Sequence, residues 1–169
     1  MTAVSPPRLV IPQQALPRIA ADVLQYGQRG VETGGFLLGD AQDRISHVAL
    51  CGSKGIVRRR DQFAVSGQAL DRLFTWAGER QLFVPAQFHS HGGHHGQRPF
   101  LSPTDEAHGF RVDGFVSSVI PGFTNPPMQP SSWGWWQFRG QRWAAVAPAG
   151  VDAGNAVFIT FDEDGVRGA

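Results

Sequence analysis

The sequence predicts an α+β domain, or a three-layer α/β domain, in which helices flank a central mixed β-sheet. Segments with the apolar pattern of strands and segments with helical spacing are intermixed, without the regular alternation of a doubly wound fold. The chain has 169 residues, of which 41% are hydrophobic, which suits one domain with one core. We therefore expect residues 1–169 to form a single domain.

The chain begins with a short predicted strand followed by a helix. Leu9 to Ile11 is apolar, and apolar residues recur at helical spacing from Gln13 to Gln28, with Gly30 as the stop. The turn-like Glu32-Thr33-Gly34-Gly35 then leads into the apolar segment Phe36-Leu37-Leu38. This pattern predicts a buried strand that is entered through a glycine turn.

The middle of the chain mixes both kinds of element. We expect a strand at Arg44–Leu50, a helix at Gly67–Arg80 and a strand at Leu82–His89. A glycine- and histidine-rich loop at Gly92–Leu101 follows, then a short helix from Ser102 onwards and a strand at Phe115–Ile120.

The last part of the chain reads as a loop, a hairpin and a strand. Pro121 to Ser132 contains four prolines and predicts a loop. Trp133–Phe138 and Arg142–Val146 predict a hairpin that turns at Gly140, and Val157–Phe161 predicts a final strand. We expect the aromatic side chains of the hairpin to pack in the core and on the sheet.

Composition excludes several classes of protein. The formal net charge is +1, and the only dense basic run, Arg58-Arg59-Arg60 beside Asp61, predicts a solvated turn and no nucleic-acid footprint. No apolar run approaches the roughly 18 residues that cross a bilayer, so no membrane is expected as a partner. Met1 to Leu9 lacks the pattern of a signal peptide, which predicts a cytoplasmic location.

The cysteine content restricts how a metal ion is held. Cys51 is the only cysteine, which excludes an internal disulfide and a cysteine-rich zinc module. Histidines and carboxylates must therefore be the ligands of any metal ion in this chain.

His89-Ser90-His91 is the most informative segment of the sequence. It lies at the end of a predicted strand, where side chains two residues apart point to the same face. Both imidazoles are therefore able to bind one ion. Taken alone, the pattern also fits two surface histidines at a strand end.

Ser102-Pro103-Thr104-Asp105 predicts a helix start, with Ser at the N-cap, Pro at the first helical position and an acidic residue at the third. The same spacing suits a third ligand, Asp105, beside the histidines. Two imidazoles and one carboxylate are the ligands of catalytic zinc sites, which keep one position open for water. Such sites also need a general base, and Glu32 is the best candidate.

Three segments, taken together and in order, resemble the JAMM signature of the JAB1/MPN/Mov34 metalloprotease family. They are Glu32 to Gly39, His89-Ser90-His91 and Ser102-Pro103-Thr104-Asp105. The resemblance extends more loosely from Leu9 to Trp143. Ten residues separate His91 from Ser102, a longer spacer than is commonest in the family.

The resemblance implies a three-layer fold of the MPN and cytidine-deaminase-like type and a role for each signature residue. His89, His91 and Asp105 would bind one Zn²⁺ per chain, Glu32 would be the general base, and Ser102 would stabilise the tetrahedral intermediate.

Four further residues are candidates for substrate contact. Gly34 and Gly35 would let the substrate approach closely. His94 and His95, in the longer loop, would face the substrate or solvent more readily than they would bind the metal.

The family cleaves peptide or isopeptide bonds at the C-terminus of ubiquitin or ubiquitin-like proteins. The resemblance therefore implies a bacterial deubiquitinase-like enzyme that removes a ubiquitin-like modifier from its conjugates or trims its precursor. Activating and conjugating enzymes of the same pathway would be its partners, in antiviral defence or in sulfur-carrier processing.

The sequence leaves two alternatives open. A catalytically inactive MPN scaffold would bind only protein partners, although such domains generally lack part of the metal set. His89-Ser90-His91-Gly92-Gly93-His94 also resembles the metallo-β-lactamase pattern, but Gly93 replaces its aspartate and no histidine follows His108.

Overall fold

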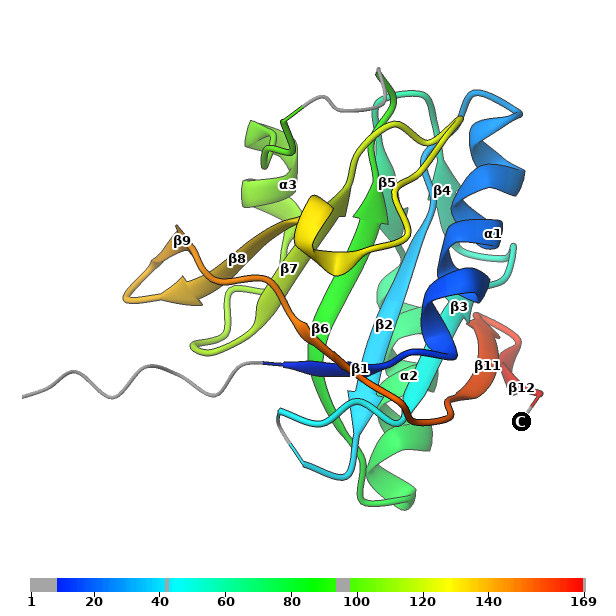
Figure 1. The fold of residues 1–169 in the computed structure, drawn as a ribbon. Helices are drawn as coiled ribbons and strands as arrows, with labels where there is room; N and C mark the ends of the chain where they lie inside the picture. Colours follow the sequence, from blue (N-terminus) through cyan, green and yellow to red (C-terminus); the bar gives the residue numbers. More distant parts are fainter. Residues whose placement is uncertain (1–8, 42, 94–97, 169) are drawn as a thin grey trace, which may run out of the picture.

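The computed structural model describes residues 9–41, 43–93 and 98–168. Among these residues, an eight-stranded mixed sheet with the order β12-β11-β3-β2-β6-β7-β8-β9 forms the centre of the molecule (Figure 1). Its strands are β2 (Gly34–Gly39), β3 (His47–Cys51), β6 (Phe83–Ser90), β7 (Val116–Ile120), β8 (Gly134–Arg139), β9 (Arg142–Ala145), β11 (Val157–Asp162) and β12 (Gly165–Arg167). The pairs β3–β11 and β6–β7 are parallel, and the other neighbours are antiparallel.

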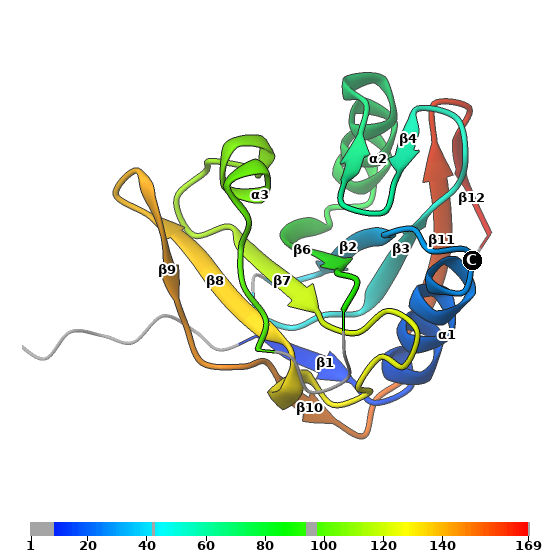
Figure 2. The ribbon, with the colours of Figure 1, turned by 90° about the horizontal axis from the view of Figure 1, so that it is seen from above.

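Helices cover both faces of this sheet. The view from above shows α1 (Ala15–Gly27) on one face and α2 (Gly67–Glu79) on the other, with α3 (Pro103–His108) on the same side as α2 (Figure 2). The predicted fold class, an α+β domain with a mixed sheet flanked by helices, is confirmed. No helix among the described residues has the length and apolarity to cross a bilayer.

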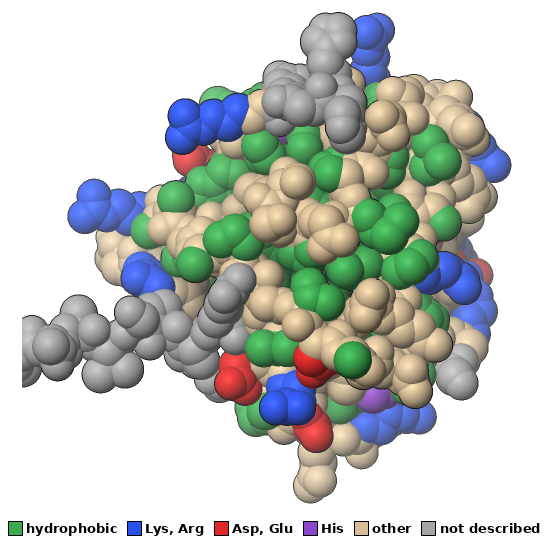
Figure 3. Space-filling model, in the orientation of Figure 1, with side chains coloured by type: hydrophobic (Ala, Val, Ile, Leu, Met, Phe, Trp, Pro, Cys, Tyr) green, Lys and Arg blue, Asp and Glu red, His purple; other side chains and the backbone are tan. Residues whose placement is uncertain are grey.

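The burial of β2 follows from this layering. All its residues are buried, and successive side chains enter different cores: Leu37 packs in the cluster under α1, whereas Phe36 and Leu38 pack in the cluster under α2. A strand that is covered on both faces reads as a continuous apolar run, as this one does. On the face drawn in Figure 3, hydrophobic side chains gather over the middle, and most charged side chains lie towards its edge.

Two small sheets complete the described part of the fold. The parallel pair β1 (Val10–Pro12) and β10 (Gly150–Asp152) lies on the α1 side, and the antiparallel hairpin β4 (Ile56–Arg58) and β5 (Phe63–Val65) lies on the α2 side (Figure 2). The sequence patterns did not predict β4, β5, β10 or β12. The proline-rich segment also contains a short 3₁₀ helix at Pro130–Ser132, where only a loop was expected.

Two local predictions need correction. Gly34 and Gly35 do not form a turn, because both already lie in β2. A Cβ at Gly34 would collide with the Phe88 carbonyl oxygen and the Phe63 ring, and one at Gly35 with the Ala49 carbonyl oxygen. These glycines are therefore required by the close approach of the protein's own strands.

The second correction concerns the basic run. Arg58 is not part of a solvated turn, because it ends β4 and its guanidinium group is partly buried and hydrogen-bonded. Arg59 and Arg60, which follow it, are exposed as expected.

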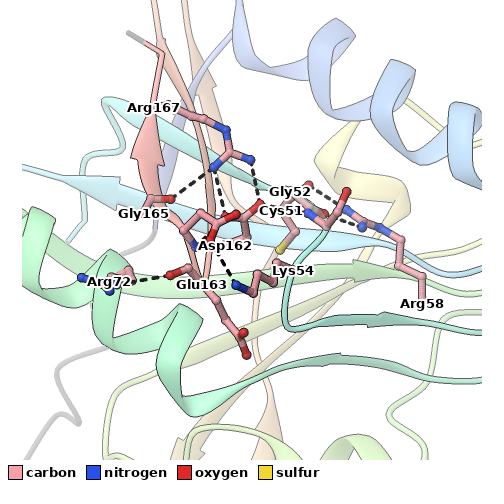
Figure 4. A network of polar contacts seen from close by, with 11 residues as sticks. Cys51, Gly52, Lys54, Arg58, Arg72, Asp162, Glu163, Gly165 and Arg167 are labelled. Atoms are coloured by element: carbon pink, nitrogen blue, oxygen red, sulfur yellow. Dashed lines mark hydrogen bonds and ion pairs between the residues drawn. The ribbon is translucent and has the colours of Figure 1, made fainter.

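Asp162, at the end of β11, holds the C-terminal strands to the loop after β3 (Figure 4). Its carboxylate accepts hydrogen bonds from the backbone N–H groups of Ser53 (3.1 Å) and Asp164 (2.9 Å) and from the guanidinium of Arg167 (2.7 and 3.0 Å). The hydrogen bonds from Arg167 hold the pKa of Asp162 well below its usual range, although burial opposes them. The carboxylate therefore stabilises the fold in its ionised form.

We expect Asp162→Asn to lower the free energy of unfolding by about 1 to 3 kcal/mol at pH 7, measured by urea denaturation, because a buried charged acceptor is lost. The folded-state pKa is depressed, so this contribution is present above about pH 4 and is lost as the pH falls towards the folded-state pKa. The difference in the free energy of unfolding between wild type and Asp162→Asn should therefore become smaller at low pH.

Asp164→Asn is the matched control. Asp164 and its partner Lys54 are 68% and 63% exposed, so this substitution should cost less than about 0.5 kcal/mol. Equal losses in the two variants would contradict the assignment of Asp162 as the anchor.

Candidate metal centre

The end of β6 brings two histidines together. His89 lies in the strand and His91 directly after it, and they are 5% and 8% exposed. Because alternate residues of an extended segment face the same side, their rings meet, with the Nε2 atoms 3.1 Å apart. The two imidazoles therefore lie together, as the His-x-His spacing indicates.

The start of α3 brings a carboxylate to the same point. Ser102 caps the helix: its Oγ accepts a hydrogen bond from the Asp105 N–H at 3.0 Å, and the Asp105 carboxylate accepts one from the Ser102 N–H at 2.9 Å. This capping box fixes the side chain of Asp105. Its Oδ1 lies 3.2 Å from His89 Nε2, and its Oδ2 lies 3.0 Å from His91 Nε2.

The three groups form a donor set that fits a divalent cation. In a tetrahedral zinc site with ligands at about 2.0–2.1 Å, neighbouring ligand atoms are about 3.3 Å apart. The distances here, 3.0 to 3.2 Å, are close to that spacing. Two neutral imidazoles that aim lone pairs at a shared point beside a carboxylate repel one another unless a proton or a cation lies among them.

Glu32 lies on another side of the histidine pair. It precedes β2, is 5% exposed, and donates its backbone N–H to the Arg59 carbonyl oxygen at 2.8 Å. Its carboxylate and a ring nitrogen of each histidine all lie within 4.8 Å of one another. Such a separation can be bridged by one water molecule.

Two carboxylates thus compete for the third position beside the histidines. Asp105 contacts both rings through its two carboxylate oxygens, at 3.2 and 3.0 Å. Glu32 has a carboxylate oxygen within 4.8 Å of a ring nitrogen of each histidine. A cation held by both histidines and Asp105 would leave the Glu32 carboxylate beside it to act on a water molecule.

The two carboxylates differ in their affinity for protons. Burial, reinforced by the charges of Asp105 and Asp61, raises the pKa of Glu32 to about 8. Burial would also raise the pKa of Asp105, but the hydrogen bonds with His89 and His91 outweigh it and hold that pKa well below its usual range. One acid is thus suited to stay ionised and the other to exchange a proton near neutral pH.

The cluster lies between two hollows of different size. The larger, of about 810 Å³, is lined in part by Glu32, His91 and Ser102. The smaller, of about 40 Å³, is lined in part by His89 and Asp105. The cluster is therefore accessible from two sides.

Aromatic side chains that the sequence did not single out pack against the two histidines. Phe63 of β5 stacks on His89, with ring centroids 6.4 Å apart, and Phe100 meets His91 edge-on at 5.0 Å. Both contacts arise from tertiary packing, and no local motif marks these positions.

The remaining candidates are placed as follows. Gly34 and Gly35 are buried in β2 against neighbouring strands, so contact between them and a substrate stays a prediction. His94 and His95 lie outside the described residues.

A scan of protein-family models finds no match to this chain, and a search of curated proteins finds no relative. Solved structures do resemble it. A protein from Desulfitobacterium hafniense, determined in solution, has a TM-score of 0.64 at 13% identity and covers 87% of this chain and 94% of its own. A protein from Salinibacter ruber has a TM-score of 0.54 at 21% identity, covering 88% and 95%.

A JAB1/MPN domain protein from Archaeoglobus fulgidus is also similar, at 16% identity, covering 85% of this chain and 99% of its own. Its TM-score of 0.49 is too low to support a conclusion about this chain. At such identities the first two similarities establish the fold alone. The site residues must therefore be judged on their own geometry.

We expect the wild-type protein to bind about one zinc ion per chain, measured by plasma emission spectrometry after dialysis, because three protein ligands converge. His89→Ala should lose this ion, since one of the three ligands is missing. Glu32→Gln should retain it. His47→Ala, which changes a histidine outside the cluster, is the control, and loss of zinc in that variant as well would point to unfolding.

Glu32 should also leave a signature in the metal-free protein. Because its pKa is raised from 4.5 to about 8 on folding, the folded state holds a proton that the unfolded state releases. The stability of the zinc-stripped protein should therefore fall as the pH rises from about 5 to 8. Glu32→Gln should flatten this dependence in urea denaturation curves, and an unchanged slope would contradict the raised pKa.

Proposed function

We propose that this protein is a zinc-dependent peptidase or isopeptidase of the JAB1/MPN/Mov34 type that cleaves at the C-terminus of a ubiquitin-like protein. One observation carries the proposal. The residues of the JAMM-like signature, which are far apart in the sequence, meet at one point, with Asp105 against both histidines and the Glu32 carboxylate within 4.8 Å of a ring nitrogen of each.

His89, His91 and Asp105 would hold the zinc ion. When bound, zinc lowers the pKa of a water molecule towards about 7 and polarises a carbonyl oxygen. Glu32 lies where its carboxylate would take a proton from that water molecule and return it to the leaving amine.

Ser102 is suited to stabilise the oxyanion of the substrate. Its Oγ accepts a hydrogen bond from the Asp105 N–H, and a hydroxyl group that accepts in this way can still donate its own hydrogen. It lines the larger hollow together with Glu32. The helix cap would thus hold a hydrogen-bond donor beside the oxyanion of the tetrahedral intermediate.

The surroundings of the cluster support an extended polypeptide as the substrate. A chain that passes from the larger hollow to the smaller one would cross the cluster. In the described residues β5 pairs only with β4, and Phe63 and Ala64 of β5 line the smaller hollow. The free edge of β5 would then add the modifier tail as a further strand through backbone hydrogen bonds.

The narrowness of the smaller hollow, about 40 Å³, favours a tail with small side chains next to the cleaved bond. An enzyme with this specificity would remove the ubiquitin-like modifier from its conjugates or trim its precursor. Activating and conjugating enzymes of the same pathway would be the partners of such an enzyme.

We expect Glu32→Gln to lower the rate of cleavage of a ubiquitin-like protein fused at its C-terminus by about 10²- to 10⁴-fold, because the general base is lost. The zinc content should be unchanged. Cleavage is measured by gel and mass spectrometry, which also identify the bond that is cut.

Glu79→Gln is the matched control, because Glu79 ends α2, is 68% exposed and lines neither hollow. It should keep the cleavage rate within a few-fold of the wild type. Full activity in Glu32→Gln would remove Glu32 from the mechanism. Zinc binding without cleavage of any such fusion would favour a non-catalytic scaffold.

A further inference from the structure

We propose that Arg58 is a positioning residue for the reaction. Through Thr33, it holds the backbone next to Glu32 and so keeps the Glu32 carboxylate at its distance from the histidine pair. This inference rests on the proposed function, and it assigns Arg58 no contact with substrate or metal.

The guanidinium of Arg58 is anchored in several directions. Its terminal nitrogens donate to the carbonyl oxygens of Cys51 (2.7 Å) and Gly52 (2.6 Å) at the end of β3 (Figure 4). Its Cζ lies over the ring of Tyr26 in α1, 3.9 Å from the ring centroid. Its Nε then donates to Thr33 Oγ1 at 3.0 Å. The side chain thus links β4, β3, α1 and the residue after Glu32.

Thr33 in turn is bonded to the middle of the His-x-His segment. Its N–H donates to Ser90 Oγ at 2.9 Å, while its carbonyl oxygen accepts from the Ser90 N–H at 2.8 Å and from the Ser90 hydroxyl at 3.2 Å. Both residues are fully buried. Ser90 stands between His89 and His91, so Thr33 connects the position of Glu32 to that of the histidines.

The hairpin β4–β5 completes the arrangement around Glu32. The carbonyl oxygen of Arg59, the residue after Arg58, accepts a hydrogen bond from the Glu32 N–H at 2.8 Å. Arg58 itself donates to Thr33. Glu32 and Thr33 are therefore held between the hairpin and β6. Two hydrogen bonds between the described residues join this segment to the hairpin: Arg58 to Thr33, and Glu32 to Arg59. If the first is lost, the second remains.

The geometry requires arginine in particular. Three nitrogens of one planar guanidinium donate to Thr33, Cys51 and Gly52 at once, and the same group makes a cation–π contact with the ring of Tyr26. A lysine ammonium keeps the charge but is a single point, which cannot reproduce this set of contacts. Arg58→Lys is therefore the conservative variant that isolates positioning from charge.

We expect Arg58→Lys to keep its zinc content while kcat for the fusion falls roughly 10- to 100-fold with KM little changed, because a small displacement of a catalytic group is costly. In hydrogen–deuterium exchange, the amides of Glu32 and Thr33 should exchange faster than in wild type. Arg142→Lys, at an exposed arginine of β9, is the control and should alter neither measurement.

The Glu32→Gln background separates positioning from general loss of structure. There, Arg58→Lys should add no further loss to the residual single-turnover rate, since the group it positions is already gone. A further loss of equal size in that background, or an unchanged kcat in Arg58→Lys alone, would overturn the inference.

The exchange measurement keeps the two proposals distinguishable. If the wild-type protein cleaves no fusion, the proposed function fails. If the amides of Glu32 and Thr33 exchange at the wild-type rate in Arg58→Lys, the positioning role fails as well. Faster exchange confined to these amides would support Arg58 as the residue that fixes this segment.

Discussion

The pairing of the start of β2 with the end of β6 is the contact on which the site depends. Gly34 pairs with His89, and Ser90 is bonded to Thr33 through both its backbone and its hydroxyl group. This register places Glu32 beside the two histidines, although 57 positions separate Thr33 from Ser90. A shift by one residue would turn the histidines to the other face of the strand and disperse the cluster.

Such a cluster has an energetic cost. Glu32, His89 and His91 are each less than one tenth exposed, and burial of groups that can ionise opposes folding unless they are paired. The apolar cores on both faces of the sheet and the hydrogen bonds of Thr33, Ser90 and Arg58 offset that cost. A bound cation would add stability by compensating the clustered lone pairs and carboxylates.

Much of the fold follows from local patterns in the sequence. Helical spacing indicates α1 and α2, apolar runs indicate β2 and β6, and Ser102-Pro103-Thr104-Asp105 indicates the capped start of α3. The same patterns bring the signature residues to strand and helix ends, where they meet. These features are predictable because each depends on residues that are close in the sequence.

The missed features depend on tertiary contacts. The strands β4 and β5 are three residues each, too short for a periodic signal, so the environment of Arg58 could not be inferred. The pair Gly34-Gly35 indicates a turn and a close strand approach equally well, and only the position of the Phe88 carbonyl oxygen decides between them. The contacts of Phe63 and Phe100 with the histidines follow from packing in the same way.

The role of the cluster as a zinc site can be tested by anomalous diffraction from crystals of the zinc-loaded protein, recorded on both sides of the zinc absorption edge. We expect one strong peak about 2.0–2.2 Å from His89 Nε2, His91 Nε2 and an oxygen of Asp105, with the Glu32 carboxylate outside bonding distance. A peak bonded to Glu32 in place of Asp105, or no peak at these residues, would contradict the assignment.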